Sequence, residues 1–162
     1  MSFFKKELGR FPLGIWIAFI ALILISLAWI MQAYSLCNWE SAVELGLQNQ
    51  SFSGDTAEVI QARKDKGIAI ADLLWPLPLT VIALVGILKK RVVGFIASMM
   101  TFAICVYFPL FHFFWLWSAH RETAIAAALL WGVPSLLGIG GLWANRKLYF
   151  SKVNSKNSNH LQ

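Results

Sequence analysis

Residues 73–120 read LLWPLPLTVIALVGILKKRVVGFIASMMTFAICVYFPLFHFFWLWSAH, and this stretch decides the fold. It holds two apolar runs, 73–88 and 92–120, separated only by three consecutive basic residues. A bilayer core of about 30 Å requires about 20 helical residues at about 1.5 Å each. Two apolar helices joined by so short a basic turn must lie antiparallel, with the turn at one face of a membrane. The stretch therefore predicts a transmembrane helical hairpin.

Two further runs without Asp, Glu, Lys or Arg lie outside this hairpin, at 11–39 and 123–145. Of the 162 residues, 58% are hydrophobic and 14% are charged, whereas about 25% are charged in a typical soluble domain. The runs leave no polar helix face, which argues against a water-soluble bundle, and they lack the alternation of barrel strands. The sequence predicts an all-α fold, an integral membrane four-helix transmembrane bundle.

The predicted boundaries follow from the charged residues and the helix length. They are a cytoplasmic N-terminus 1–11, transmembrane helices 12–35, 68–88, 92–117 and 123–144, an external loop 36–67, a cytoplasmic turn 89–91, an external turn 118–122 and a cytoplasmic tail 145–162 that is expected to be disordered. In the external loop, Asp55 has the pattern of a helix N-cap, with Glu58 reaching back to it. The loop is therefore expected to be partly helical.

The distribution of lysine and arginine predicts the orientation, because these residues favour cytoplasmic loops. Ten of them lie on one side of the predicted bundle and four on the other, whereas seven of the eight acidic residues lie on the side with four. Both termini are therefore predicted to be inside (N-in/C-in). One alternative is that helix 12–35 is a cleaved signal peptide, but its apolar region is longer than the usual 7–15 residues.

Asp72 is the most informative single residue. The charge-free part of its helix, 73–88, spans about 24 Å at 1.5 Å per residue, which is shorter than the bilayer core. The predicted helix 68–88 therefore draws the Asp72 carboxylate about one turn into the outer membrane boundary. A carboxylate at that depth either reaches the headgroups and water or needs a partner or a proton inside the bundle.

Several polar residues fall near the level of Asp72 or outside it and define a candidate outer-mouth cluster. The cluster consists of Asp72, His112, His120, Glu122, Glu40 and Glu44. Such side chains can bind a divalent metal, relay a proton or sense pH. Their spacing matches no metal-ligand motif, so neither a metal nor a cofactor is predicted. Alternatively, His112 packs within a helix interface, and His120 and Glu122 are solvated turn residues.

Small residues recur along the fourth predicted helix and define a candidate helix-contact stripe. They are Ala124, Ala128, Gly132 and Gly140. Small residues let membrane helices approach closely, so the stripe serves either internal packing or docking to another protein. The glycines at 138, 140 and 141 are expected to loosen the inner end of this helix. Prolines in three helices are expected to bend them and can open a cavity.

The lead hypothesis on function is a non-enzymatic accessory, sensory or interaction protein of a cell membrane, in a bacterium the inner membrane. Its expected partners are the lipid bilayer and either another membrane protein or further copies of itself. The net charge of +6 is explained by the membrane orientation, so no nucleic-acid partner is expected. Two alternatives stay open: a proton-linked or small-solute transport component using Asp72 and His112, and a membrane enzyme acting on a lipid or quinone in the aromatic outer half.

Overall fold

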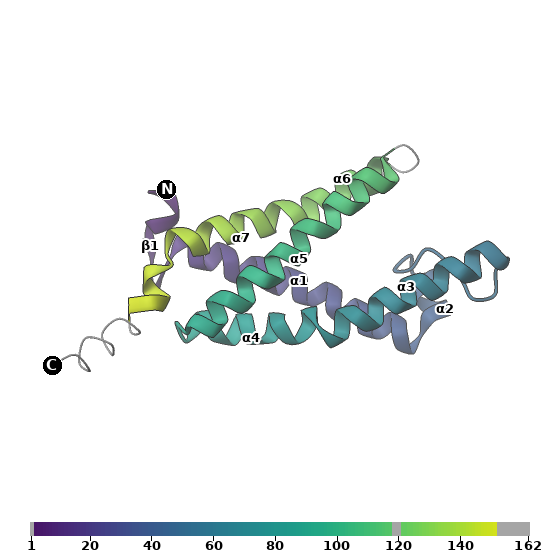
Figure 1. Ribbon diagram of the computed structural model, residues 1–162, viewed down its shortest axis with the longest axis horizontal. Coiled ribbons are helices and arrows are strands. Elements are labelled where there is room, and N and C mark those ends of the chain that lie inside the picture. The colour runs from purple at the N-terminus through teal and green to yellow at the C-terminus, as the bar shows by residue number, and fades with distance from the viewer. Residues whose placement is uncertain (1, 118–120, 152–162) are drawn as a thin grey trace. The chain divides into compact units, whose positions relative to one another are not determined.

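The computed structural model describes residues 2–117 and 121–151, and these are mostly helical (Figure 1). Four helical segments among them are long and apolar enough to cross a membrane. They are Leu13–Cys37, Thr56–Leu88, Val92–Trp115 and Arg121–Ala144. The predicted set of four long apolar helices is therefore confirmed, and it indicates a multi-pass membrane protein.

The chain divides into two compact units. Unit 1 combines Met1–Ile23 with Leu79–Gln162, and unit 2 is Leu24–Pro78. The elements, in chain order, are η1 (Phe3–Lys5), β1 (Glu7–Leu8), β2 (Phe11–Pro12), α1 (Leu13–Cys37), α2 (Trp39–Glu44), α3 (Thr56–Leu74), α4 (Pro76–Leu88), α5 (Val92–Leu116), α6 (Arg121–Ala127), the π-helical segment η2 (Ala128–Gly132) and α7 (Val133–Ala144). α1 begins in unit 1 and ends in unit 2, and α4 begins in unit 2 and ends in unit 1.

Unit 2 contains the loop that was expected to be partly helical. The short helix α2 follows α1 directly, and α3 begins at Thr56, well before the boundary of 68 placed from hydropathy. The start of α3 has the expected cap, because the Glu58 N–H donates to the Asp55 carboxylate at 2.9 Å. The Glu58 side chain folds back against Gly54. A capped first turn satisfies one of the backbone N–H groups that have no partner within the helix at its start. This cap explains why α3 can begin as early as Thr56.

Unit 1 is packed through glycines that let backbones meet. A Cβ atom on Gly86 would clash with the backbone of Gly94, at the two sides of the α4–α5 turn, and one on Gly141 would clash with the backbone of Gly14. Gly138 in α7 similarly faces the ring of Phe102 in α5. The expectation that the glycines loosen the end of α7 is therefore wrong: the missing side chains allow closer helix contact, as in other membrane helices.

The members of the helix-contact stripe face different neighbours inside unit 1. Ala124 is fully buried. A Cβ on Gly132 would lie 3.4 Å from the Pro109 ring of α5, and one on Gly140 would lie 3.6 Å from the ring of Phe4. Ala128 is half-buried at the start of η2. These contacts favour the internal-packing interpretation over a docking face.

The close approach of α4 and α5 yields a stability prediction with a matched control. We expect Gly94→Ala to lower the free energy of unfolding by about 1–3 kcal/mol, since the new methyl overpacks against Gly86. By contrast, Gly67→Ala in the middle of α3, where no atom lies within 4 Å of the new Cβ, should raise it by about 0.5–1 kcal/mol. Denaturant titration in mild detergent measures both, and equal effects at the two positions contradict this account.

Candidate functional site

The helix that carries Asp72 is interrupted one turn after it. α3 ends at Leu74, Trp75 leaves the helical conformation with φ −122° and ψ −64°, and Pro76 opens α4. Proline disfavours the helical conformation for the residue before it, and the φ of Trp75 departs from helical values while its ψ stays negative. Pro76 also has no N–H to donate to the carbonyl of Asp72, four residues earlier. The break therefore places a backbone carbonyl that lacks its normal helical donor on the same residue as the carboxylate.

A second residue reaches the Asp72 carboxylate from α1. The Gln32 side chain hydrogen-bonds to Asp72, while its Oε1 accepts a hydrogen bond from Gln48 Nε2 at 2.9 Å. Because a carboxylate only accepts hydrogen bonds, the Nε2 of Gln32 is the group that donates to it. Asp72, Gln32 and Gln48 thus form a chain of two amides that ends on a carboxylate, which we call the Asp72 site.

The backbone positions Gln48 through α2. The N–H groups of Leu47 and Gln48 both donate to the Ala42 carbonyl, at 2.8 and 3.2 Å, which closes the end of α2. Gly46 adopts φ +72° in this turn, a conformation that suits glycine. The chain then returns beside α1, within reach of Gln32.

The loop after Gln48 is fixed by a carboxylate and an indole from α2. Glu40 accepts the Ser51 hydroxyl at 2.5 Å and the Phe52 N–H at 3.0 Å. The Trp39 indole N–H donates to the Gln50 carbonyl at 2.9 Å, and its ring packs 5.4 Å from that of Phe52. Hydrogen bonds to a charged acceptor are stronger than neutral ones. These contacts therefore fix the loop that follows Gln48, a member of the Asp72 site.

Neutral groups, and not a cation, meet the Asp72 carboxylate inside unit 2. Asp65 of the same helix has a lysine partner, Lys64, at 4.0 Å, whereas the group that acts on Asp72 is the Gln32 amide. An arginine or lysine beside Asp72 would stabilise the ionised carboxylate. An amide N–H can donate equally to a carboxylate or to the carbonyl oxygen of a protonated acid. The site can therefore accommodate both protonation states without moving a charged partner.

The structure separates the other members of the predicted outer-mouth cluster into distinct roles. Glu40 serves the loop, and Glu44 is exposed at the end of α2. In unit 1, His112 Nδ1 lies 3.0 Å from the Phe108 carbonyl of its own helix, and Glu122 is exposed in the first turn of α6. His120 lies outside the described residues. Within the described part of the chain, no three His, Cys, Asp or Glu side chains form a group that could hold a metal ion.

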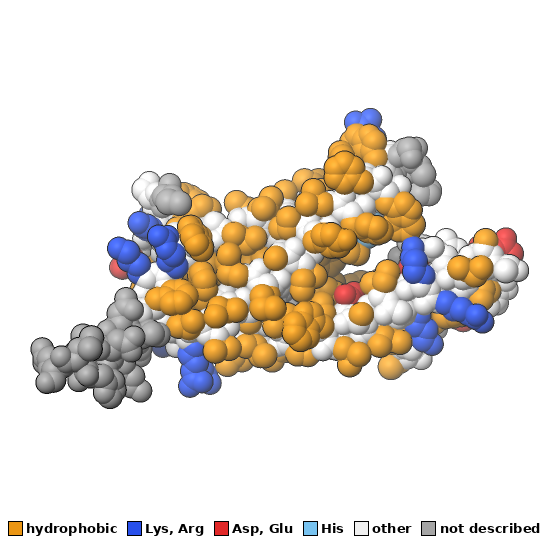
Figure 2. Space-filling view, viewed as in Figure 1, with side chains coloured by type: hydrophobic (Ala, Val, Ile, Leu, Met, Phe, Trp, Pro, Cys, Tyr) orange, Lys and Arg blue, Asp and Glu red, His pale blue; other side chains and the backbone are white. Residues whose placement is uncertain are grey.

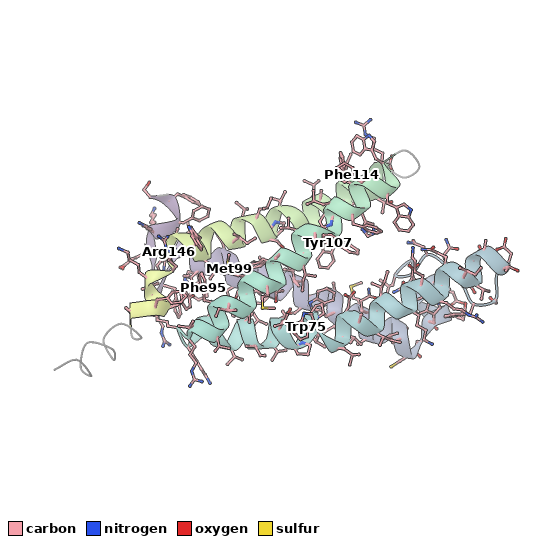
Figure 3. The ribbon with its side chains drawn as sticks, viewed as in Figure 1. Trp75, Phe95, Met99, Tyr107, Phe114 and Arg146 are labelled. Carbon is pink, nitrogen blue, oxygen red and sulfur yellow. The ribbon has the colours of Figure 1, made fainter. Side chains whose placement is uncertain are left out.

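His112 belongs to an aromatic ladder on α5. Its ring lies 4.0 Å from that of Phe108 and 5.6 Å from that of Phe111. On the same helix, a shallow open groove is lined by Tyr107, Leu110, Phe111, Phe114 and Trp115. Tyr107 and Phe114, both labelled on α5 in Figure 3, are strongly exposed. A surface of this kind suits contact with lipid chains or with an apolar helix.

Two members of the Asp72 site, Gln32 and Gln48, were not predicted from the sequence. A signal for Gln32 was present, because it is an amide within the charge-free run 11–39, and polar side chains in apolar helices seek polar partners. Gln48 carries no such signal, since it lies in a polar loop. Only the fold of α2 and its following turn brings it beside Gln32.

No protein-family model, no curated protein and no solved structure matches this chain.

The two hydrogen bonds that Glu40 accepts from the loop should contribute to the local stability of that loop. Glu40→Ala removes both acceptors from the loop, so the amide of Phe52 should exchange with solvent about tenfold faster, corresponding to about 1.4 kcal/mol of local stability. Hydrogen exchange followed by mass spectrometry measures this on peptides that cover the loop. The control is Glu44→Ala on the same short helix, which should leave that exchange unchanged. Equal acceleration in both variants would mean that α2 has simply unfolded.

Proposed function

We propose that this chain is a small multi-pass membrane protein in which Asp72 takes up and releases a proton as part of a sensory or transport function. The observation that carries the proposal is the carboxylate beside a proline break, hydrogen-bonded by a chain of neutral amides. It combines the sensory part of the lead hypothesis with the alternative of a proton-linked transport component, and it keeps Asp72 but not His112 from that alternative.

The apolar segment around Asp72 supports a site that takes up and releases a proton. Asp72 lies in a segment, Thr56–Leu88, that is apolar enough to span a membrane. Ionisable residues in such segments are costly to bury, and they mark proton relays and ion pathways. Discontinuous helices supply ion sites in many transporters, because the break frees backbone carbonyls. Asp72 combines both features in one residue.

His112 plays no part in this proposal. Its ring nitrogen already meets the Phe108 carbonyl, and its ring stacks within the aromatic ladder of α5. These contacts engage Nδ1, one of the two ring nitrogens, and the apolar face of the ring. The proton-linked function is therefore proposed on Asp72, and His112 serves as its comparison.

The test of the proposed function combines a spectroscopic and a functional readout. Infrared difference spectroscopy of the protein in liposomes should show a carboxyl C=O band that titrates with pH and disappears in Asp72→Asn. The same variant should reduce pH-driven proton uptake into proteoliposomes to the level of protein-free liposomes. His112→Phe, which preserves the ring stacking, should behave like the unmodified protein in both assays.

A matched control separates a specific site from a general loss of charge. Asp65→Asn changes a second carboxylate of α3, which is hydrogen-bonded to Gln61 at 3.1 Å, and should retain both the band and the uptake. The proposal fails if Asp72→Asn remains folded and keeps the titrating band, or if Asp65→Asn loses proton uptake equally. Gln32→Leu serves as a second variant: it removes the amide donor and should shift the pH at which the band titrates.

We also propose that the protein lies in a cell membrane with both termini in the cytoplasm, in a bacterium the inner membrane. The support is the distribution of charge, with ten basic residues on the proposed inner side and four on the outer. The opposite bias of the acidic residues agrees with it. This orientation places the end of α1 and the loop that is hydrogen-bonded to Glu40 on the outside.

Cysteine chemistry tests the orientation without introducing any residue. Cys37 is exposed at the end of α1, whereas Cys105 is buried within α5. A membrane-impermeant maleimide added to intact cells should therefore label the unmodified protein and fail to label Cys37→Ser. Labelling of Cys37 only after the membrane is permeabilised would reverse the proposed orientation.

A further inference from the structure

Three basic segments that are far apart in the sequence converge at one end of unit 1. The N-terminal segment and the α4–α5 turn meet where Lys90 lies over the ring of Phe11, and the residues after α7 join them through a hydrogen bond from Asn145 Nδ2 to the Phe4 carbonyl at 3.0 Å. Figure 2 shows lysine and arginine gathered over these elements, at the left of the view. The basic end consists of Lys5, Lys6, Arg10, Lys89, Lys90, Arg91, Arg146 and Lys147.

Two of these cations share one aromatic ring. The Arg10 guanidinium lies 5.5 Å from the centre of the Phe11 ring, and the Lys90 ammonium lies 5.1 Å from it. Phe11 is buried, and Trp16 packs edge-on against it at 5.9 Å. The Trp16 indole N–H in turn donates to the Leu8 carbonyl at 2.9 Å. The β1–β2 hairpin thus carries a buried ring, Phe11, that both cations contact.

Lys90 adopts a backbone conformation that its side chain disfavours. Its φ of +51° lies in the left-handed region, where a Cβ atom is costly and glycine is usual. The turn needs this conformation, because the Arg91 N–H donates back to the Gly86 carbonyl at 3.0 Å. Strained residues of this kind occur preferentially where the side chain has a function. A glycine would fit the turn better but would remove the charge.

The positive charges at this end have little protein counter-charge. Unit 1 contains two acidic residues, Glu7 and Glu122, and neither forms an ion pair with a described lysine or arginine. Burial raises the pKa of the Tyr149 phenol, so this group remains neutral and adds no negative charge. Arg146 donates to the Trp143 carbonyl at 3.1 Å and stacks on its ring, which caps the end of α7. Arg10 and Lys90 also lie over a ring, but among the described residues neither side chain caps a helix through a hydrogen bond.

We propose that Arg10 and Lys90 bind the phosphate of an anionic phospholipid headgroup at the basic end of unit 1. A guanidinium presents paired donors that match phosphate oxygens, and a lysine adds a compact charge. Two exposed apolar side chains lie close to these cations in the sequence: Leu8 in β1 and Val93 at the start of α5. Acyl chains attached to the phosphate would cover such surfaces, which a free phosphate ion would not. The chemistry therefore favours a lipid over a soluble anion.

Lipid titration of the intact protein in mild detergent tests the proposal by native mass spectrometry. The unmodified protein should bind phosphatidylglycerol more tightly than phosphatidylcholine with the same acyl chains. Each of Lys90→Gly and Arg10→Gln should weaken phosphatidylglycerol binding about fivefold, and the double variant by roughly twentyfold, since one basic residue near a membrane contributes about 1 kcal/mol. Lys90→Gly should at the same time keep or raise the thermal unfolding temperature, because glycine suits the turn.

The matched control removes two other cation–ring contacts. Arg121 lies 4.4 Å from the centre of the Trp117 ring, and Lys66 lies 5.4 Å from that of Phe52. The double variant Arg121→Gln with Lys66→Gln has the same net charge as the test variant and should retain the phosphatidylglycerol affinity.

Three outcomes overturn the proposal. They are equal binding of the two lipids, unchanged phosphatidylglycerol binding by folded Lys90→Gly, and an equal loss of affinity in the control. A fourth arm adds inorganic phosphate at concentrations matched to the lipid. Displacement of the lipid by phosphate at equal concentration would identify a soluble anion as the ligand and would also reject the lipid site.

Discussion

Backbone hydrogen bonding in an apolar environment is the constraint on which this structure depends. A helix in hydrocarbon must satisfy its own N–H and C=O groups, since no water is present to do so. α1 meets this condition over 25 residues, whereas α5, of the same length, contains Pro109, which has no N–H to donate to the Cys105 carbonyl. The regular pattern is interrupted at Trp75, before Pro76, and in η2, before Pro134. Each interruption removes a donor from a carbonyl, and the first of them lies one turn from the carboxylate of the Asp72 site.

The close packing of unit 1 is typical of helices that associate in an apolar environment. Because lipid chains are as apolar as leucine, burying large side chains gives little advantage, and helices associate through close contact. Gly86 against Gly94 and Gly14 against Gly141 bring backbones together. The Lys89–Arg91 turn can be so short only because those glycines let α4 and α5 meet immediately. The same short turn forces Lys90 into the left-handed region and over Phe11.

Local features were predictable from the sequence, and contacts between distant segments were not. The four apolar helices follow from charge-free runs, and the start of α3 follows from Asp55 and Glu58, because both signals lie within a few residues. Asp72 was recognisable because its helix is too short without it. Its partner Gln32 is forty residues away, and no periodicity specifies which face of α1 meets α3. The role of the glycines was misread because close packing requires knowledge of the facing helix.

Asp72 and the basic end illustrate two opposite ways of handling charge in an apolar protein. The basic end brings lysine and arginine side chains together with little protein counter-charge, so the anions that neutralise them have to come from outside the chain. The Asp72 site instead surrounds one acid with neutral amides that are held by their own hydrogen bonds. A lysine or arginine in place of Gln32 would have stabilised the ionised carboxylate permanently. The neutral amide can donate to Asp72 in either protonation state, so it does not fix the charge of the carboxylate. A proton-responsive residue requires this property.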